Sequence, residues 1–328
     1  MIRSHAALIS IGLCALFLSH CTSHETIAPP ETAKVSHLSE PISQPIAASD
    51  KGQFVKIAEF ESQFIQPRGL TIWLPPGYDP TNQKYPVIYA HDGQNLMETE
   101  GSYRGVEWNL DEVSTRLIKE EKARPAIIVG IWNTDKRWWE YAPEKIINNL
   151  PEEAFAVSED NPEGVKPELY SDAYLKFIVE ELKPYIDSNY ATAPGRENTS
   201  IMGSSMGGLI SLYALAEYPE VFSKAACLST HWVLARPESP AANAATQAIL
   251  AYLDSSKIGE YPQTIWFDHG TIELDQYYAR HSVDIEAWFR ENGWDKNAAQ
   301  FRVYEGTGHK EEYWASRAHE YLAFLMAQ

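Results

Sequence analysis

The chain has 328 residues, of which 44% are hydrophobic, and its formal net charge is −18. That hydrophobic content is enough to bury a large core, which excludes a wholly disordered chain. The acidic residues are spread along the sequence, and an acidic surface repels phosphate backbones, so the charge argues against nucleic acid as a partner.

The amino terminus has the features of an export signal. Arg3 supplies a positive charge, and residues 6–18 form an apolar run that is shorter than the roughly 20 residues of a membrane span. We therefore predict a signal peptide over residues 1–21. Cys21 stands where bacterial lipoproteins carry their lipidated cysteine, although His20 replaces the usual small residue before it. The expected location is exported: a lipoprotein anchored to a membrane through Cys21, or a periplasmic protein cleaved just after it.

Residues 22–53 are predicted to form a flexible tether, because they are rich in Ser, Thr and Ala and contain four prolines. The remaining residues, 54–328, form the predicted folded domain. Cys227 lies in an apolar run and is expected to be a buried thiol without a disulfide partner. No spacing of Cys and His resembles a zinc site, so no metal is expected.

Within the domain, short apolar runs alternate with segments of helical periodicity. The runs predict strands at 56–64, 70–74, 87–90, 126–131, 199–202, 225–228, 264–267 and 301–304. Helices are predicted at 171–188, with Ser171 as N-cap, in the run after residue 208, at 277–289 and at 313–325. This alternation predicts an α/β fold with a mostly parallel central sheet and helices on both faces. Ligands of such sheets bind at the carboxyl ends of the strands.

The sequence Gly203-Ser204-Ser205-Met206-Gly207 lies between the predicted strand 199–202 and a helical run. A serine on a sharp strand-to-helix turn needs small residues on both sides, and Gly203 and Gly207 supply them. The context predicts that Ser205 is a nucleophile. A Gly-rich turn without chemistry is the alternative.

A serine hydroxyl needs a neighbouring base, which in this type of fold is a histidine near the end of the chain. His309 follows the strand 301–304 through a Gly-rich turn and fits that position. The acid that orients the histidine is expected in the loop after strand 264–267. Asp275 is favoured, Glu273 is the alternative, and Asp268 is expected to brace the turn.

A developing oxyanion needs two fixed N–H donors. One is expected from the backbone of Met206, directly after the nucleophile. The other is expected from the backbone of Gln94, in the loop that follows strand 87–90.

Bulky and polar side chains follow two strands at the same edge of the predicted sheet. They suit stacking on a sugar ring or an aromatic acyl group, and some are equally suited to fill the core. The predicted pocket wall consists of Trp132, Arg137, Trp138, Trp139, His231 and Trp232.

Three motifs together resemble the esterase D-like esterases, which include enterochelin, acetyl xylan and feruloyl esterases. They are His-Asp-Gly-Gln-Asn-Leu at 91–96, Gly-Ser-Ser-Met-Gly-Gly at 203–208 and Gly-Thr-Ile-Glu-Leu-Asp at 270–275. The resemblance implies an α/β-hydrolase catalytic domain that cleaves an acyl ester through an acyl-enzyme, without metal or cofactor. The expected substrate is a small-molecule or glycan ester, such as an acylated sugar or siderophore. Acyl transfer by the same residues and a non-catalytic binding protein remain alternatives, and the oligomeric state is not predicted.

Overall fold

The computed structural model describes residues 51–155, 166–234, 237 and 239–327. The predicted signal peptide, Cys21 and nearly all of the predicted tether lie outside these residues. The first strand begins at Gln53, where the predicted tether ends. Within the described residues, no helix is long and apolar enough to cross a membrane.

An eight-stranded sheet organises the domain, in the order β1-β2-β4-β3-β5-β6-β7-β8. β1 pairs antiparallel with β2, β2 pairs antiparallel with β4, and every other pairing is parallel. The strands are β1 Gln53–Phe60, β2 Arg68–Leu74, β3 Val87–His91, β4 Ile127–Ile131, β5 Thr199–Ser204, β6 Lys224–Leu228, β7 Thr264–Gly270 and β8 Ala299–Tyr304.

The helices connect the strands or, for α9 and α10, follow the last one, and they cover the sheet. They are α1 Leu110–Lys119, α2 Arg137–Tyr141, α3 Glu144–Asn148, α4 Ser171–Lys176, α5 Lys183–Asn189, α6 Met206–Glu217, α7 Pro240–Ser255, α8 Ala279–Glu291, α9 Glu311–Ser316 and α10 Ala318–Leu325. A π-helical stretch, Phe177–Leu182, joins α4 to α5. Short 3-10 turns include Gly93–Asn95 after β3 and Glu273–Tyr277 after β7.

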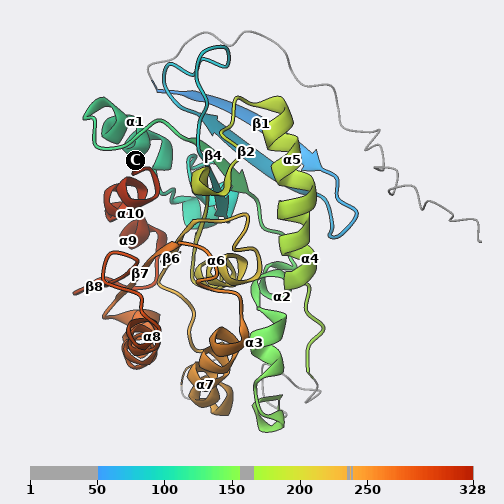
Figure 1. The fold of residues 1–328 in the computed structure, drawn as a ribbon, viewed down its shortest axis with the longest axis vertical. Helices are drawn as coiled ribbons and strands as arrows, with labels where there is room; N and C mark the ends of the chain where they lie inside the picture. The colour runs from blue at the N-terminus through green and yellow to red at the C-terminus, as the bar shows by residue number, and fades with distance from the viewer. Residues whose placement is uncertain (1–50, 156–165, 235–236, 238, 328) are drawn as a thin grey trace, which may run out of the picture. The chain divides into compact units, whose positions relative to one another are not determined.

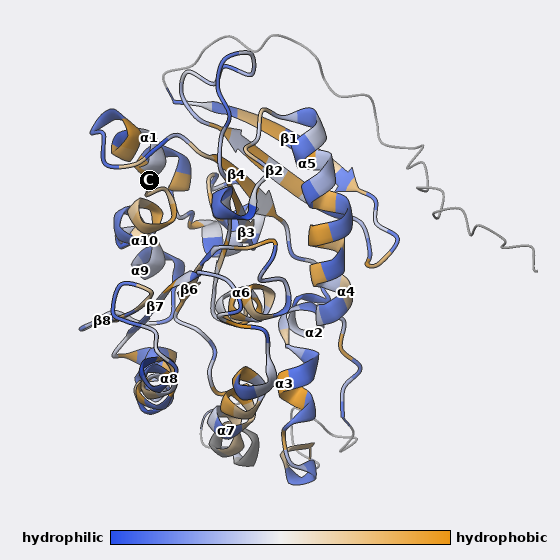
Figure 2. Cartoon of the chain, in the orientation of Figure 1, coloured by the Kyte–Doolittle hydropathy of each residue, from blue (hydrophilic) through white to orange (hydrophobic). Residues whose placement is uncertain are grey.

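Two apolar clusters lie on opposite faces of the sheet. Successive residues of β3 alternate between them: Val87 and Tyr89 belong to one cluster, and Ile88 and Ala90 belong to the other. Helices α2 to α8 contribute to the first cluster, and α1, α9 and α10 contribute to the second (Figure 1). Hydrophobic colour concentrates on β2 and α6, while α8 shows mainly hydrophilic residues (Figure 2). The prediction of a mostly parallel sheet covered on both faces is confirmed.

All eight predicted strands are present with shifted ends, whereas the helices α1, α2, α3 and α7 were not predicted. The first strand ends at Phe60 rather than residue 64, because the Ser62 hydroxyl accepts hydrogen bonds from the N–H groups of Phe64 and Ile65 and forms a turn. The prediction of Ser171 as an N-cap is wrong. Tyr170 holds that position, and the Ser171 hydroxyl accepts from the Glu144 N–H instead.

The predicted carboxyl-terminal helix is divided into α9 and α10. Arg317 stands between them with φ −106° and ψ 9°, which is not a helical backbone. Its guanidinium is buried and donates to Asp268 at 2.7 Å and to Ser229 at 3.0 Å. The break places this cation beneath the strand ends that carry the candidate site.

Candidate active site

Ser205 occupies a strained turn between β5 and α6. Its φ of 58° and ψ of −122° form a conformation that L-residues seldom adopt and that costs about 1–3 kcal/mol. A Cβ on Gly203 would lie 2.8 Å from the carbonyl carbon of Gly207, so the turn has room only for glycine there. The Ser205 N–H donates to the Leu228 carbonyl at 2.8 Å, which ties the turn to the neighbouring strand. Ser205 remains partly exposed.

His309 and Asp275 form the next part of the site. Nδ1 of His309 lies 2.6 Å from Oδ1 of Asp275, whose side chain is fully buried. The other carboxylate oxygen accepts from the Gly270 N–H and the Ser229 hydroxyl, both at 2.7 Å. Burial alone would raise the pKa of Asp275, but these hydrogen bonds and the charge of His309 outweigh burial and hold the pKa below its usual value. The carboxylate is therefore ionised and directed at the imidazole.

The other two candidate carboxylates, Glu273 and Asp268, point elsewhere. Glu273 forms an ion pair with Lys310 at the surface, and its side chain is 35% exposed. Asp268 accepts from Arg317 and braces the turn below the site, as the sequence suggested. Of the three candidates, the structure places Asp275 on the histidine.

The loop after β3, residues 91–94, lies against the start of α6 and is called the oxyanion loop below. Asp92 has φ 57° and ψ 42°, in the left-handed region. Gly93 follows it at a point where an added Cβ would lie 2.3 Å from the carbonyl carbon of Gly130 on β4. The loop therefore turns in contact with the backbone of the adjacent strand.

The two predicted oxyanion donors each lie in a first helical turn, where backbone N–H groups lack partners within the helix. Met206 is the first residue of α6, and Gln94 lies in the 3-10 turn of the oxyanion loop. A Cβ built on Gly207 would lie 3.4 Å from Cβ of His91, so the two segments are in contact. The start of α6 also carries the positive end of that helix dipole.

Arg137 does not stand free in the pocket wall. Its Nε and Nη2 atoms donate to the two carboxylate oxygens of Asp92, at 2.7 and 2.8 Å. Asn133 adds a hydrogen bond from Nδ2 to the same carboxylate at 2.5 Å. These bonds use one edge of the guanidinium and leave the side chain 29% exposed, so a contact of Arg137 with a polar substituent of the substrate stays a prediction.

Three tryptophans of the predicted wall are at least partly accessible. Nε1 of Trp132 donates to the Thr71 hydroxyl at 2.9 Å, which fixes the ring across β2. Trp138 is partly buried against the core, whereas Trp139 is 37% exposed and has the Lys136 ammonium 5.4 Å from its ring centre. Trp139 therefore offers an aromatic face to solvent.

The residues after β6 divide between core and site. Trp232 is 1% exposed and packs against Phe267, so its prediction as a pocket wall is corrected: the ring fills the core. His231 is half-buried, and its Nδ1 lies 2.8 Å from the Tyr278 hydroxyl. The Tyr278 ring meets the His309 ring edge-to-face at 5.7 Å. His231 thus reaches the candidate base through one tyrosine.

Sequence reasoning missed the polar support beneath Asp275. The Ser229 hydroxyl bonds to Asp275 and also accepts from Nε1 of Trp314 at 2.9 Å and from Arg317 at 3.0 Å. Trp314 additionally packs edge-to-face on the His309 ring at 5.1 Å. The one available signal for Ser229 was that it is a polar residue directly after the apolar strand predicted at 225–228.

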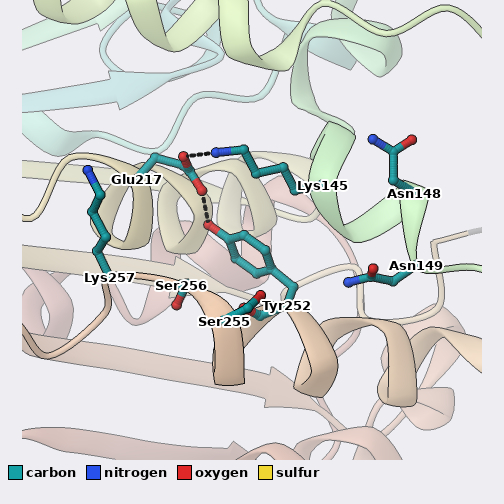
Figure 3. A pocket seen from close by; sticks show the side chains of 8 residues that line it. All are labelled: Lys145, Asn148, Asn149, Glu217, Tyr252, Ser255, Ser256 and Lys257. Atoms are coloured by element: carbon teal, nitrogen blue, oxygen red, sulfur yellow. Dashed lines mark hydrogen bonds and ion pairs between the residues drawn. The ribbon is translucent and has the colours of Figure 1, made fainter. Parts of the chain in front are cut away.

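A polar pocket lies at the other end of α6 (Figure 3). The Glu217 carboxylate accepts there from the Tyr252 hydroxyl at 2.7 Å and pairs with Lys145. Since α6 rises about 1.5 Å per residue, Glu217 lies roughly 17 Å along the helix from its start at Met206. The lining residues include none of the candidate site: Lys145, Asn148, Asn149, Glu217, Tyr252, Ser255, Ser256 and Lys257.

Solved structures with a similar fold are esterases and related hydrolases. An IroE-like serine hydrolase from Shewanella oneidensis aligns with TM-score 0.63 and 18% identity, over 84% of this chain and 80% of that one. A ferulic acid esterase from the anaerobic fungus Anaeromyces mucronatus aligns with TM-score 0.59 and 22% identity, over 89% of this chain and 96% of that one. At these identities the likeness establishes the fold alone, and it confirms the predicted α/β-hydrolase architecture.

Sequence relatives match about half of the chain. The uncharacterized protein YbbA of Bacillus subtilis is 25% identical over 50% of this chain and 58% of its own length. The ferri-bacillibactin esterase BesA of the same species is 28% identical over 48% of this chain and 52% of its own length. The chain therefore spans between half and three-fifths of the length of these two curated relatives.

The family comparison covers much more of the chain. The family model named "Putative esterase" matches residues 62–325, which include β2 to β8 and all of the candidate site residues. This chain belongs to the putative esterase family.

Proposed function

We propose that the chain is a serine carboxylic ester hydrolase that works through an acyl-enzyme. The observation that carries the proposal is the hydrogen bond of 2.6 Å between His309 and the buried, ionised Asp275. It accompanies a strained, partly exposed Ser205 at the carboxyl edge of the same sheet. A binding protein has no need of a buried carboxylate that orients a histidine at the same sheet edge as such a serine.

In the proposed reaction, Oγ of Ser205 adds to the ester carbonyl carbon while its proton passes to Nε2 of His309. The electrons of the carbonyl π bond move to oxygen, and the backbone N–H groups of Met206 and Gln94 stabilise the negative charge. Asp275 accepts from Nδ1–H of His309, keeps Nε2 free to take the proton, and stabilises the imidazolium.

Collapse of this intermediate expels the alcohol, which takes the proton from His309. The acyl group then remains on Ser205 as an ester. Water adds in the same way, with His309 as base, and releases the acid and the free serine. These steps need only the side chains and backbone groups named here.

We propose a small-molecule or glycan ester with a bulky acyl or alcohol group as the substrate. The names of the relatives support this class, because BesA is a ferri-bacillibactin esterase and a relative from Xylanibacter ruminicola is an endo-1,4-beta-xylanase/feruloyl esterase. The accessible ring of Trp139 supports it from the structure, since aromatic faces stack on sugars and aromatic acids.

The nucleophile is tested by Ser205→Ala. The variant should lose p-nitrophenyl acetate turnover and covalent labelling by a fluorophosphonate, because triad members act as a unit. Ser204→Ala is the matched control from the same motif and should keep the label; Ser204 is 2% exposed. Labelling of Ser205→Ala at the wild-type level would reject the proposal.

A further inference from the structure

The carboxylate of Asp92 is the centre of a buried polar network beside the candidate site. Its side chain is 4% exposed and receives the fork of Arg137 and the amide of Asn133. We propose that Arg137 and Asn133 are positioning residues, which hold the oxyanion loop through Asp92 so that the Gln94 N–H faces the reacting carbonyl. The inference rests on the proposed ester hydrolysis.

The contacts reach two residues of the loop, Asp92 and Gln94. Asn133 binds Asp92 through its side chain and donates its backbone N–H to the side-chain oxygen of Gln94 at 3.2 Å. Gly93, between the two, lies against the backbone of Gly130. Asn133, in the segment that follows β4, therefore contacts Gln94, the residue that carries the expected N–H donor.

The oxyanion loop needs these contacts because the backbone conformation of Asp92 is unfavourable. Asp92 is held in the left-handed region, which persists only where surrounding contacts determine the conformation. The planar guanidinium of Arg137 binds both carboxylate oxygens, so it fixes the orientation of Asp92 as well as its position. A lysine has one donating centre and cannot do this.

Charge gives a second reason for the pair. An oxygen of Asp92 lies 3.5 Å from the point where a Cβ on Gly207 would sit, directly after the Met206 donor. An unpaired carboxylate there would oppose the negative charge that forms on the substrate oxygen. Burial alone would raise the pKa of Asp92, but Arg137 outweighs burial and lowers that pKa, so the pair is ionised and its charges cancel.

Arg137 is itself fixed from behind. Its guanidinium lies 5.0 Å from the ring centre of Tyr141. Glu140, on the same short helix, forms a two-pronged ion pair with Arg68 of β2 at 2.7 and 3.0 Å, and both side chains are buried. Helix α2 is thus anchored to the sheet on one side and to the oxyanion loop on the other.

The test compares Arg137→Gln, Arg137→Lys, Asp92→Asn and the double variant Asp92→Asn/Arg137→Gln. Loss of one oxyanion donor typically lowers kcat by about 10²- to 10³-fold, and we expect a loss of that order for Arg137→Gln with KM for p-nitrophenyl acetate nearly unchanged. Arg137→Lys should lie between it and the wild type. The double variant should lose about as much as the worse single variant, because the pair acts as a unit.

The inhibition constant Ki of a trifluoromethyl ketone is a second measurement, which should not change if the role of Arg137 is merely structural. The adduct of this ketone with serine places a negative oxygen at the proposed donors, so the Ki should rise in parallel with the fall in kcat/KM across the series. Arg302→Gln, which removes an exposed arginine from β8, should change neither quantity. Thermal unfolding identifies variants that fail to fold. If Arg137→Gln fails to fold, the test rests on Asp92→Asn and Arg137→Lys.

Three results would overturn the inference. Arg137 would be a substrate contact if its loss raised KM with kcat and the ketone Ki unchanged. Its role would be purely structural if folded variants kept the wild-type kcat and the wild-type Ki. If the losses of the two single variants multiplied in the double variant, Asp92 and Arg137 would act independently and not as a pair. Failure of the proposed function is distinguishable, because then the wild type would show no hydrolysis or Ser205→Ala would retain it.

Discussion

Ser205 and Asp92 are held at φ angles of 58° and 57°, which side chains other than glycine seldom adopt. Each stands close to a glycine that touches another backbone segment, Gly203 in one case and Gly93 in the other. Strain of this kind persists where neighbouring contacts determine the conformation, and it is frequent at reactive sites. These two of the eight described non-glycine residues with positive φ belong to the proposed nucleophile turn and the proposed oxyanion loop.

The sequence was sufficient to propose Ser205 and His309 because a motif and a chain order identify them. It left the acid open, since the end of β7 and the loop after it offer three carboxylates within residues 268–275. The 3-10 turn Glu273–Tyr277 separates the two main candidates: Asp275 turns inward and is fully buried, while Glu273 pairs with Lys310 outside. Such a rotation depends on tertiary contacts that no local pattern reveals.

Asp275→Asn should lower kcat by about 10⁴-fold, because the amide no longer favours the required tautomer of His309 or stabilises the imidazolium. Glu273→Gln should cost far less, since it removes only a surface ion pair. Steady-state kinetics with p-nitrophenyl acetate check both changes, with thermal unfolding as a control for the buried hydrogen bonds of Asp275. The opposite order of losses would transfer the role to Glu273.

At the scale of elements, α2 shows how one turn of helix divides its side chains. Arg137 and Glu140 point into ion pairs, while Trp139 is exposed. The sequence places these side chains at the carboxyl edge of the sheet because they follow an apolar strand. It does not show which face of the short helix each one takes, so the ion pair of Arg137 with Asp92 was not predicted. Trp232 was misplaced for a related reason, because a turn directs its ring into the core.

Trp139→Ala should raise KM for bulky aromatic or sugar esters while barely changing turnover of p-nitrophenyl acetate, because only large substrates would reach the exposed ring. Trp138→Ala is the matched comparison: this ring packs partly against the core, so its loss should lower the melting temperature more. Kinetics on one small and one bulky ester check the pair. Equal losses on both esters for Trp139→Ala would make that tryptophan structural.

At the scale of the whole molecule, the sheet was predictable because its central strands are short runs of apolar residues. Every residue of β3, β4 and β5 is buried, as in parallel sheets covered on both faces. The ends of elements were less predictable, because single side-chain hydrogen bonds such as those of Ser62 and Arg317 determine them. Residues 1–21 lie outside the described residues, and the leader that they are expected to form stays a prediction from sequence.

We propose that the chain is exported and attached to a membrane by lipid on Cys21, because this cysteine follows a short apolar run. Expressed in bacteria with its leader, the protein should incorporate radioactive palmitate and fractionate with membranes, and Cys21→Ser should abolish both. Cys14→Ser and Cys227→Ser are matched controls that should keep the label, since Cys14 lies within the apolar run and Cys227 is buried in β6. A wild-type protein that is soluble in the periplasm would contradict the lipid anchor and support cleavage of an ordinary signal peptide. Unprocessed wild-type protein in the cytoplasm would contradict export altogether.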